Sequence, residues 1–293
     1  MSITVVSFIL PPEPGSPAAV IDALMPATNQ LQMLVKSLRR VNGNVNLHVL
    51  TDAPRYGDDV VHHIFPSRID PNQMMLGAAH AFARFFDEYD FLSPVVLVDP
   101  DILFFADIAP VFDLDPDFDI ALTRRDESDM PFNSGIIFAN TTQPDAVRYF
   151  FKRHSEIIAL ELMDNADWFA DQLVLNRIMD TATQVAPDRF VFEGVRIKLL
   201  DANEYNYSPP REHPSLLRRP HAAVYHFKGR CRTFMLPFFE HFVTPGRFKP
   251  IARVLDTVRL TRERSALKEV FYSDEKRVKP KHRADTASHD SSV

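Results

Sequence analysis

The sequence predicts an α/β fold with a mixed, mostly parallel sheet flanked by helices. The first fifty residues follow the order strand, helix, strand, which is how a parallel sheet begins. The continuous apolar run Val95–Val98 is typical of a strand buried on both faces. With 293 residues, the chain is long for one ordinary domain and short for two. We therefore expect one large domain with an appendage.

In the first half of the chain, each expected element has a local signal. The opening strand is rich in β-branched residues and stops at two prolines, and the first helix carries leucines at helical spacing before an Asn-Gly pair. The expected strands are Ile3–Leu10, Val45–Leu50, Val60–Phe65, Val95–Val98 and Ile102–Phe105. The expected helices are Asn29–Arg40 and Gln73–Tyr89.

The second half continues the alternation of strands and helices. We expect strands at Ile120–Thr123, Ile136–Ala139 and Ala223–Phe227, strand-rich structure over Phe190–Leu200, and helices at Asp145–Met163 and Asp167–Met179. The main domain then occupies residues 1–245. A basic amphipathic helical extension follows at 246–272, and a polar, disordered tail at 273–293. The extension fits either a helix packed on the domain or one lying on a membrane surface, where it would meet a lipid-linked substrate.

Composition excludes several classes of function. Only 8 glycines are present, with no GxGxxG and no GxxxxGK[ST] pattern, so the dinucleotide fingerprint and the P-loop are both absent. The net charge of −6 argues against nucleic acid as a partner. No apolar run approaches the roughly 20 residues that a membrane span requires. Cys231 is the single cysteine, which fits a reducing compartment, so we expect a cytoplasmic protein that is either free or peripheral to a membrane.

Two carboxylates follow the buried run at its carboxyl end, where open α/β sheets bind ligands. Asp99 and Asp101 stand two positions apart, so in extended geometry both side chains point the same way. Two hard oxygen ligands at one point suit Mg²⁺ or Mn²⁺. The pair alone fits a metal site and a capped strand-to-turn junction equally well.

The same D-x-D spacing recurs three times in the acidic segment Asp113–Asp119. That segment resembles a turn between two apolar stretches, and we interpret its aspartates as solvated loop charges. What distinguishes Asp99 and Asp101 is their position after a buried strand, where a carboxylate is costly unless it is paired or metal-bound.

Three other short segments are candidates for chemistry. Phe132–Gly135 is a small polar run that leads into an apolar strand, and its glycine permits close approach of a ligand or simply makes a turn. Asp171-Gln172 opens a helix, where an acidic residue is also ordinary. His226 ends a strand and is followed two residues later by Lys228, which supplies a borderline metal ligand and a cation for phosphate, although a lone histidine is more often structural.

In this order, the four motifs resemble GT-A-fold glycosyltransferases, the nucleotide-diphospho-sugar transferase fold. The nearest type is the family-8-like retaining enzymes, such as glycogenin and bacterial lipooligosaccharide galactosyltransferases. The resemblance runs from about Ile3 to Arg232, and the segments SLRR and LHVLTD and the pair Ala83-Arg84 add to it. It implies a catalytic domain over 1–245 that transfers a hexose from a nucleoside-diphosphate sugar, with UDP as the expected carrier.

The resemblance also implies roles for individual residues. Mn²⁺, or Mg²⁺ in its place, would be bound by Asp99, Asp101 and His226. The donor would be bound by Arg84, Asp99, Asn133 and Lys228, and the catalytic pair at the sugar would be Asp171 and Gln172. The chain departs from the family's G-x-x-K-P-W segment, since it reads Gly229-Arg230-Cys231-Arg232-Thr233-Phe234. Arg230 and Arg232 are therefore candidate substitutes for the phosphate contact.

The expected reaction retains the configuration at the sugar carbon and uses a hydroxyl of a glycan, a lipid-linked molecule or a protein as acceptor. Gln172 is an amide and a poor nucleophile, so we expect front-face attack with Asp171 orienting the sugar. Two alternatives stay open: a sugar nucleotidyltransferase, for which Pro11–Pro17 is a poor nucleotide loop, and a noncatalytic sugar- or nucleotide-binding scaffold of the same fold.

Overall fold

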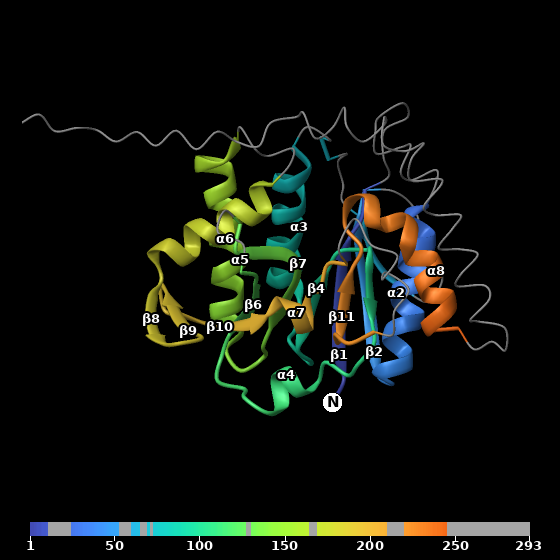
Figure 1. Ribbon diagram of the computed structural model, residues 1–293. Coiled ribbons are helices and arrows are strands. Elements are labelled where there is room, and N and C mark those ends of the chain that lie inside the picture. Colours follow the sequence, from blue (N-terminus) through green and yellow to red (C-terminus); the bar gives the residue numbers. More distant parts are fainter. Residues whose placement is uncertain are drawn as a thin grey trace, which may run out of the picture.

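The computed structural model describes residues 1–10, 25–52, 60–64, 69–70, 73–126, 130–163, 169–209 and 220–244. Over these ranges the chain forms a mixed nine-stranded sheet with helices on both faces, plus a separate two-stranded sheet (Figure 1). The order of strands in the large sheet is β3-β2-β1-β4-β7-β6-β10-β9-β8. The predicted α/β fold class is thereby confirmed.

The strands are β1 (Ile3–Phe8), β2 (Val45–Thr51), β3 (Val61–Ile64), β4 (Val95–Val98), β5 (Ile102–Phe104), β6 (Ile120–Arg124), β7 (Phe132–Ala139), β8 (Thr183–Ala186), β9 (Arg189–Phe192), β10 (Val195–Asp201) and β11 (Val224–His226). The helices are α2 (Ala27–Val41), α3 (Met74–Glu88), α4 (Pro110–Asp113), α5 (Pro144–Glu161), α6 (Ala170–Thr181), α7 (Ala202–Tyr205), the 3₁₀ turn η4 (Gly229–Cys231) and α8 (Arg232–Phe242).

The sheet is parallel from β3 to β4 and mixed beyond it, because β7 runs antiparallel to both β4 and β6. Strand β4 is central and fully buried. Its alternate side chains enter different cores: Val95 and Leu97 pack on one face, Val96 and Val98 on the other. This is the two-sided burial that its unbroken apolar sequence predicted.

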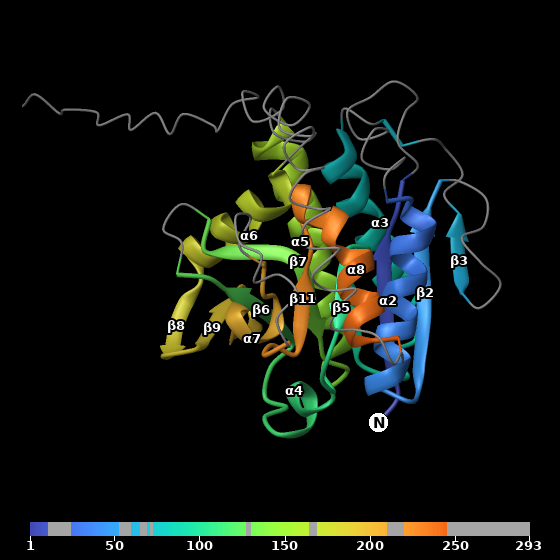
Figure 2. The same ribbon diagram turned by 45° about the vertical axis from the view of Figure 1, so that its right-hand side comes forward.

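Helices α3, α5 and α6 pack against one another over one face of the sheet. On the other face α2 contacts α8 and the small sheet made by β5 and β11, as the turned view shows (Figure 2). Aromatic side chains fill both cores, with Phe86 stacked on Phe151 in one and Phe112 stacked on Phe118 in the other. The many phenylalanines of the sequence are therefore largely core residues.

The small sheet positions the candidate site. Strand β5 follows β4 after a short turn, and it pairs antiparallel with β11, so that Ile102 lies opposite His226. The amide of Phe227 donates a hydrogen bond to the carbonyl of Asp101 at 2.8 Å. This pairing places the Asp99–Asp101 segment beside His226, although the two are far apart in sequence.

Several elements differ from those that the sequence predicted. The strand-rich segment Phe190–Leu200 is a hairpin, turned at Glu193 and Gly194 with φ of 47° and 89°, and β8 was not expected. Helix α8 was also missed, because Pro237 lies inside it. The expected extension at 246–272 and tail at 273–293 lie outside the described residues. Within those that are described, no helix has the length and apolar character to cross a membrane.

The acidic segment Asp113–Asp119 is only partly the solvated loop that we expected. Asp113 and Asp117 are exposed, but Asp119 is fully buried and accepts hydrogen bonds from the backbone and guanidinium of Arg196. Asp115 pairs with Arg189 and Lys198. For Asp119 the expectation was wrong, because Arg196, on the neighbouring strand β10 and far away in sequence, compensates its burial.

We expect Arg196→Met to destabilise the protein by about 3 kcal/mol, because it leaves the Asp119 carboxylate buried without its cation. The measurement is urea unfolding followed by circular dichroism. Arg177→Met is the matched control, since Arg177 pairs with Glu161 at the surface. A pair of that kind contributes about 0–1 kcal/mol. Equal losses in both variants would contradict the assignment of Asp119 as a buried charge that needs its partner.

Candidate metal centre and its polar network

Three predicted ligands meet where the two sheets join. The imidazole Nε2 of His226 lies 3.3 Å from Asp99 Oδ2 and 3.2 Å from Asp101 Oδ1. One possible ligand atom from each residue falls within 4.8 Å of the other two. Asp101 and His226 are almost completely buried, whereas half of the Asp99 side chain is exposed. The group is therefore closed on the protein side and open to solvent at Asp99.

The charges of the cluster hold one another in their ionised forms. Burial alone would raise the pKa of Asp101, but Arg232 and His226 together lower it well below its usual range. Burial likewise opposes protonation of His226, yet the two carboxylates raise the pKa of its imidazole. Asp101 is thus an anion at neutral pH.

Arg232 is part of this cluster, at the first position of α8. Its Nε donates to Asp101 Oδ2 at 2.6 Å. The second oxygen, Asp101 Oδ1, is buried and receives no hydrogen bond, and its neighbour in the cluster is His226 Nε2 at 3.2 Å. Two carboxylate oxygens and an imidazole nitrogen, with one buried oxygen unsatisfied, fit a divalent cation of the Mn²⁺ or Mg²⁺ type.

Gly135 makes room for the histidine. A Cβ built at this position would collide with the His226 ring and with Asn133 Oδ1. We expected the glycine to admit a ligand or to make a turn; instead it lies within β7 and makes room for the ring of His226, a candidate metal ligand. The surrounding backbone is irregular, since the register between β6 and β7 shifts after Leu122, and such bulges recur beside active sites.

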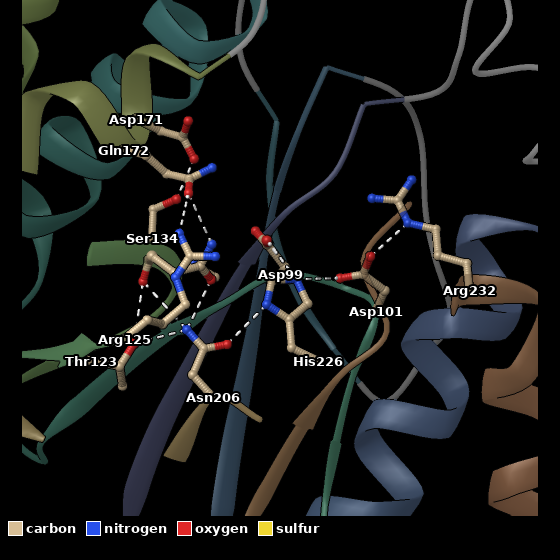
Figure 3. Close-up of polar contacts among 12 residues, drawn as sticks. Asp99, Asp101, Thr123, Arg125, Ser134, Asp171, Gln172, Asn206, His226 and Arg232 are labelled. Carbon is tan, nitrogen blue, oxygen red and sulfur yellow. Dashed lines mark hydrogen bonds and ion pairs between the residues drawn. The ribbon is translucent and has the colours of Figure 1, made fainter. Parts of the chain in front are cut away.

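A second polar group surrounds Asp171 and Gln172 at the start of α6. The Ser134 hydroxyl donates to Asp171 Oδ2, while Gln172 Oε1 accepts from Arg125 at 3.3 Å and from Asn133 at 3.2 Å. Burial raises the pKa of the Asp171 carboxyl to about 6; the Ser134 hydrogen bond opposes the rise, and the Asp99 charge adds to it. Figure 3 shows both groups and the hydrogen bonds that connect them.

The backbone before α6 is unusual. Phe169 caps this helix with φ of 69°, a left-handed conformation that is rare for a bulky residue, and its carbonyl accepts from the amides of Gln172 and Leu173. Conformations of this kind cluster at functional sites. Behind the helix, buried His154 hydrogen-bonds to the Asp171 backbone, and burial lowers the pKa of this imidazole to about 4.

Asn206 joins the two polar groups. It follows α7 and lies beside β11, because its neighbour Tyr207 forms a bridge with Tyr225. Its amide contacts His226 Nδ1 at 2.9 Å, Asn133 Oδ1 at 2.9 Å and Thr123 Oγ1 at 2.8 Å. Asn133 is itself buried, with protein partners at both ends of its amide.

The structure does not bring Arg84 into this cluster. Its guanidinium pairs with Glu88 on α3 and lines a small surface pocket with His63 and Ile64. A donor-binding role for Arg84 has no support in this geometry. Lys228 is half-buried at the start of η4, two residues beyond His226, and its phosphate role stays a prediction. The same holds for direct donor contacts of Asp99 and Asn133.

Sequence reasoning missed several members of the network: Thr123, Arg125, Ser134 and Asn206. It named Arg232 only as a phosphate contact. Ser134 stood inside the polar run that we singled out, so it was within reach. Thr123 lies within an ordinary apolar strand, Arg125 follows it, and Asn206 stands in a polar segment with no pattern of its own.

Similar folds occur among solved glycosyltransferases. A glycosyltransferase involved in glycosylation of the major capsid of the virus PBCV-1 aligns with a TM-score of 0.51 and 14% identity, over 82% of this chain and 99% of that one. The glycosyltransferase GlyE of Streptococcus pneumoniae TIGR4 aligns at 0.51 and 16%, over 94% of this chain and 64% of that one. No protein-family model and no curated protein sequence matches the chain. The chain therefore has the GT-A-type glycosyltransferase fold that its motifs predicted.

We expect Gly135→Ala to weaken Mn²⁺ binding and to destabilise the protein by about 1–3 kcal/mol, because the added methyl group displaces the His226 ring. Isothermal titration with Mn²⁺ and thermal unfolding check both effects. Gly43→Ala is the control, since a Cβ there meets nothing within 4 Å. Unchanged Mn²⁺ affinity in Gly135→Ala would contradict the placement of His226 against this glycine.

Asp171→Asn is expected to stabilise the protein at pH 8 and to leave it nearly unchanged at pH 4. The folded-state pKa of Asp171 is raised from 3.8 to about 6, so its ionisation costs stability as the pH rises through 6. At about 1.4 kcal/mol for each pKa unit, the gain is at most about 3 kcal/mol. Urea unfolding of both proteins between pH 4 and 8 measures the difference in their free energies of unfolding. His154 titrates in both proteins, so its contribution cancels from that difference. A gain that is equal at all pH values would contradict the raised pKa.

Proposed function

We propose that this protein is a metal-dependent glycosyltransferase that moves a hexose from a nucleoside-diphosphate sugar to a hydroxyl acceptor. The observation that carries the proposal is the Asp99, Asp101 and His226 cluster, with one buried oxygen left unsatisfied, linked through Asn206 and Asn133 to Gln172. The fold shared with GlyE and with the glycosyltransferase involved in PBCV-1 capsid glycosylation supports it. A noncatalytic scaffold protein would have no need of a largely buried group of two aspartates and a histidine beside a second polar group.

The difficult step in such a transfer is departure of the diphosphate, which gains negative charge. A bound Mn²⁺ or Mg²⁺ would supply Lewis-acid stabilisation of its oxygens. In this chain Asp99, Asp101 and His226 would hold the ion, and Asp99 lies on the open side where the diphosphate enters. Arg232 fixes Asp101 by a charge-assisted hydrogen bond and brings a cation to the same place. Lys228 is the second candidate cation.

Asp171 and Gln172 would face the sugar. Asp171 accepts from Ser134 and would orient a hydroxyl of the sugar. Gln172 Oε1 already accepts two hydrogen bonds, from Arg125 and Asn133, so its lone pairs are engaged. This favours front-face attack by the acceptor hydroxyl, with retention of configuration, over attack by the amide oxygen on the sugar carbon.

The finer assignments rest on the family resemblance. They are a UDP-linked donor, Mn²⁺ in preference to Mg²⁺, and a glycan, lipid-linked or protein acceptor. A cytoplasmic location, with peripheral contact to a membrane through residues 246–272, has the same standing. The buried thiol of Cys231, which contacts the Pro209 carbonyl, is compatible with a reducing compartment.

The proposal is tested by a thermal-shift panel of UDP, GDP, CDP and ADP, each with and without Mn²⁺. At 100 times its dissociation constant, a ligand should stabilise the protein by about 2.7 kcal/mol. We expect one nucleotide to give this shift in the presence of Mn²⁺ only. Asp99→Asn and Asp101→Asn should abolish it, and Asp113→Asn, an exposed aspartate from another D-x-D repeat, should leave it intact.

Absence of a shift with every nucleotide would overturn the donor site and favour the scaffold. A sugar nucleotidyltransferase is distinguished by its products, because it releases pyrophosphate from a nucleoside triphosphate and a sugar 1-phosphate. A transferase instead releases the nucleoside diphosphate when an acceptor is added. Detection of pyrophosphate would replace the present proposal with that alternative.

A further inference from the structure

The hydrogen bonds around Asn133 have a direction that is fixed by groups that can only donate. The backbone amide of Gly135 donates to Asn133 Oδ1 at 3.2 Å. Because a backbone N–H cannot accept, the atom facing it must be the amide oxygen. The other end of the Asn133 amide is then its NH₂ group, which donates to Gln172 Oε1.

Arg125 fixes Gln172 independently. A guanidinium has donors only, and its terminal nitrogen lies 3.3 Å from Gln172 Oε1. Both neighbours therefore require the oxygen of Gln172 on their side. In Figure 3 the Gln172 nitrogen is directed away from Arg125.

The same reasoning runs from Asn133 toward the metal centre. Since Asn133 Oδ1 is an acceptor, Asn206 must direct its NH₂ group toward it, at 2.9 Å, and toward Thr123 Oγ1, at 2.8 Å. The remaining Asn206 oxygen lies 2.9 Å from His226 Nδ1. An oxygen there must accept, so Nδ1 carries a hydrogen. The protonated ring has a second hydrogen on Nε2, beside both aspartates, and when the ring gives up that proton to bind a cation its lone pair is on Nε2.

We propose that Asn206 and Asn133 are positioning residues that form a hydrogen-bond relay of fixed polarity between the two halves of the site. The relay selects Nε2 of His226 as the metal-binding nitrogen and makes Gln172 present its NH₂ group, as a donor, to the sugar. The inference deepens the proposed glycosyl transfer and rests on it for the role of Gln172. Its metal-binding half can be measured without any transfer.

Two substitutions at one position separate the halves of the relay. In Asn206→Asp, a carboxylate still accepts from His226 Nδ1 but no longer donates to Asn133. In Asn206→Leu, a side chain of similar size does neither. Asn140→Leu is the matched control, because Asn140 is an equally buried asparagine whose amide bonds to the Pro116 carbonyl and the Thr141 amide, outside the site.

The experiment measures Mn²⁺ dissociation constants by titration, and kcat and KM with the nucleotide sugar that the thermal panel identifies. Loss of an outer partner of a metal-binding histidine typically costs 10–100-fold in affinity. We expect that loss in Asn206→Leu, wild-type affinity with reduced kcat in Asn206→Asp, and no change of either in Asn140→Leu. Histidine ¹⁵N spectra of the Mg²⁺-loaded wild type should show the hydrogen on Nδ1 of His226.

Three results would overturn the relay: wild-type Mn²⁺ affinity in Asn206→Leu, equal Mn²⁺ affinities in Asn206→Leu and Asn206→Asp, or a hydrogen on Nε2 of His226 in the Mg²⁺-loaded spectrum. The proposed function fails separately. If the wild type binds Mn²⁺ but transfers no sugar, the proposed glycosyltransferase function is rejected. The Mn²⁺ affinities of the Asn206 variants then still test the role of Asn206 at the metal centre. If Asn206→Asp transfers sugar at the wild-type kcat, the glycosyltransferase function stands and the link from Asn206 to Gln172 is rejected.

Discussion

The arrangement of this protein depends on one buried negative charge. The Asp101 side chain has no exposed surface, and a carboxylate can remain ionised in such a place only where opposite charge compensates it. Arg232, at the start of α8, supplies one positive partner, and His226, at the end of β11, supplies the other. The pairing of β5 with β11 and the docking of α8 against α2 are what bring these partners in. The small second sheet is therefore as much a part of the site as the large one.

A second constraint lies in β7, where local geometry departs from a regular ladder. The three residues after Asn133 have no partners on β6, although β7 continues alongside β4 and the amide of Asp99 donates to the Gly135 carbonyl. The bulge lets one short segment serve three neighbours: Asn133 bonds to Gln172, Ser134 to Asp171, and Gly135 admits His226. Regular pairing would alternate these side chains across the sheet and separate them.

The sequence predicted the parts of this design that have local causes. The run Val95–Val98 could be recognised because two-sided burial demands unbroken apolar residues, and the cost of a carboxylate after it distinguished Asp99 and Asp101 from the other D-x-D repeats. Short segments had singled out His226, Asp171 and Gln172, and the family resemblance gave them roles. What escaped prediction is made by tertiary contact: Asn206 and Arg125 have no local pattern, and Arg232 acts through α8, whose internal proline hid the helix. Arg84 lies near the end of α3, where it pairs with Glu88 outside the polar network, and its donor-binding role stays a prediction.

The separation along the chain between Asp101 and its two cations has a consequence for synthesis. A ribosome makes both aspartates in the first half of the chain, but their partners, His226 and Arg232, emerge only after the strands of the large sheet have been translated. Until then the nascent chain holds neither of the partners that compensate the buried charge of Asp101. The last helix that the structure describes, α8, therefore completes the charge balance of the candidate site as well as the core. Contacts between residues so far apart in sequence are slow to form during folding.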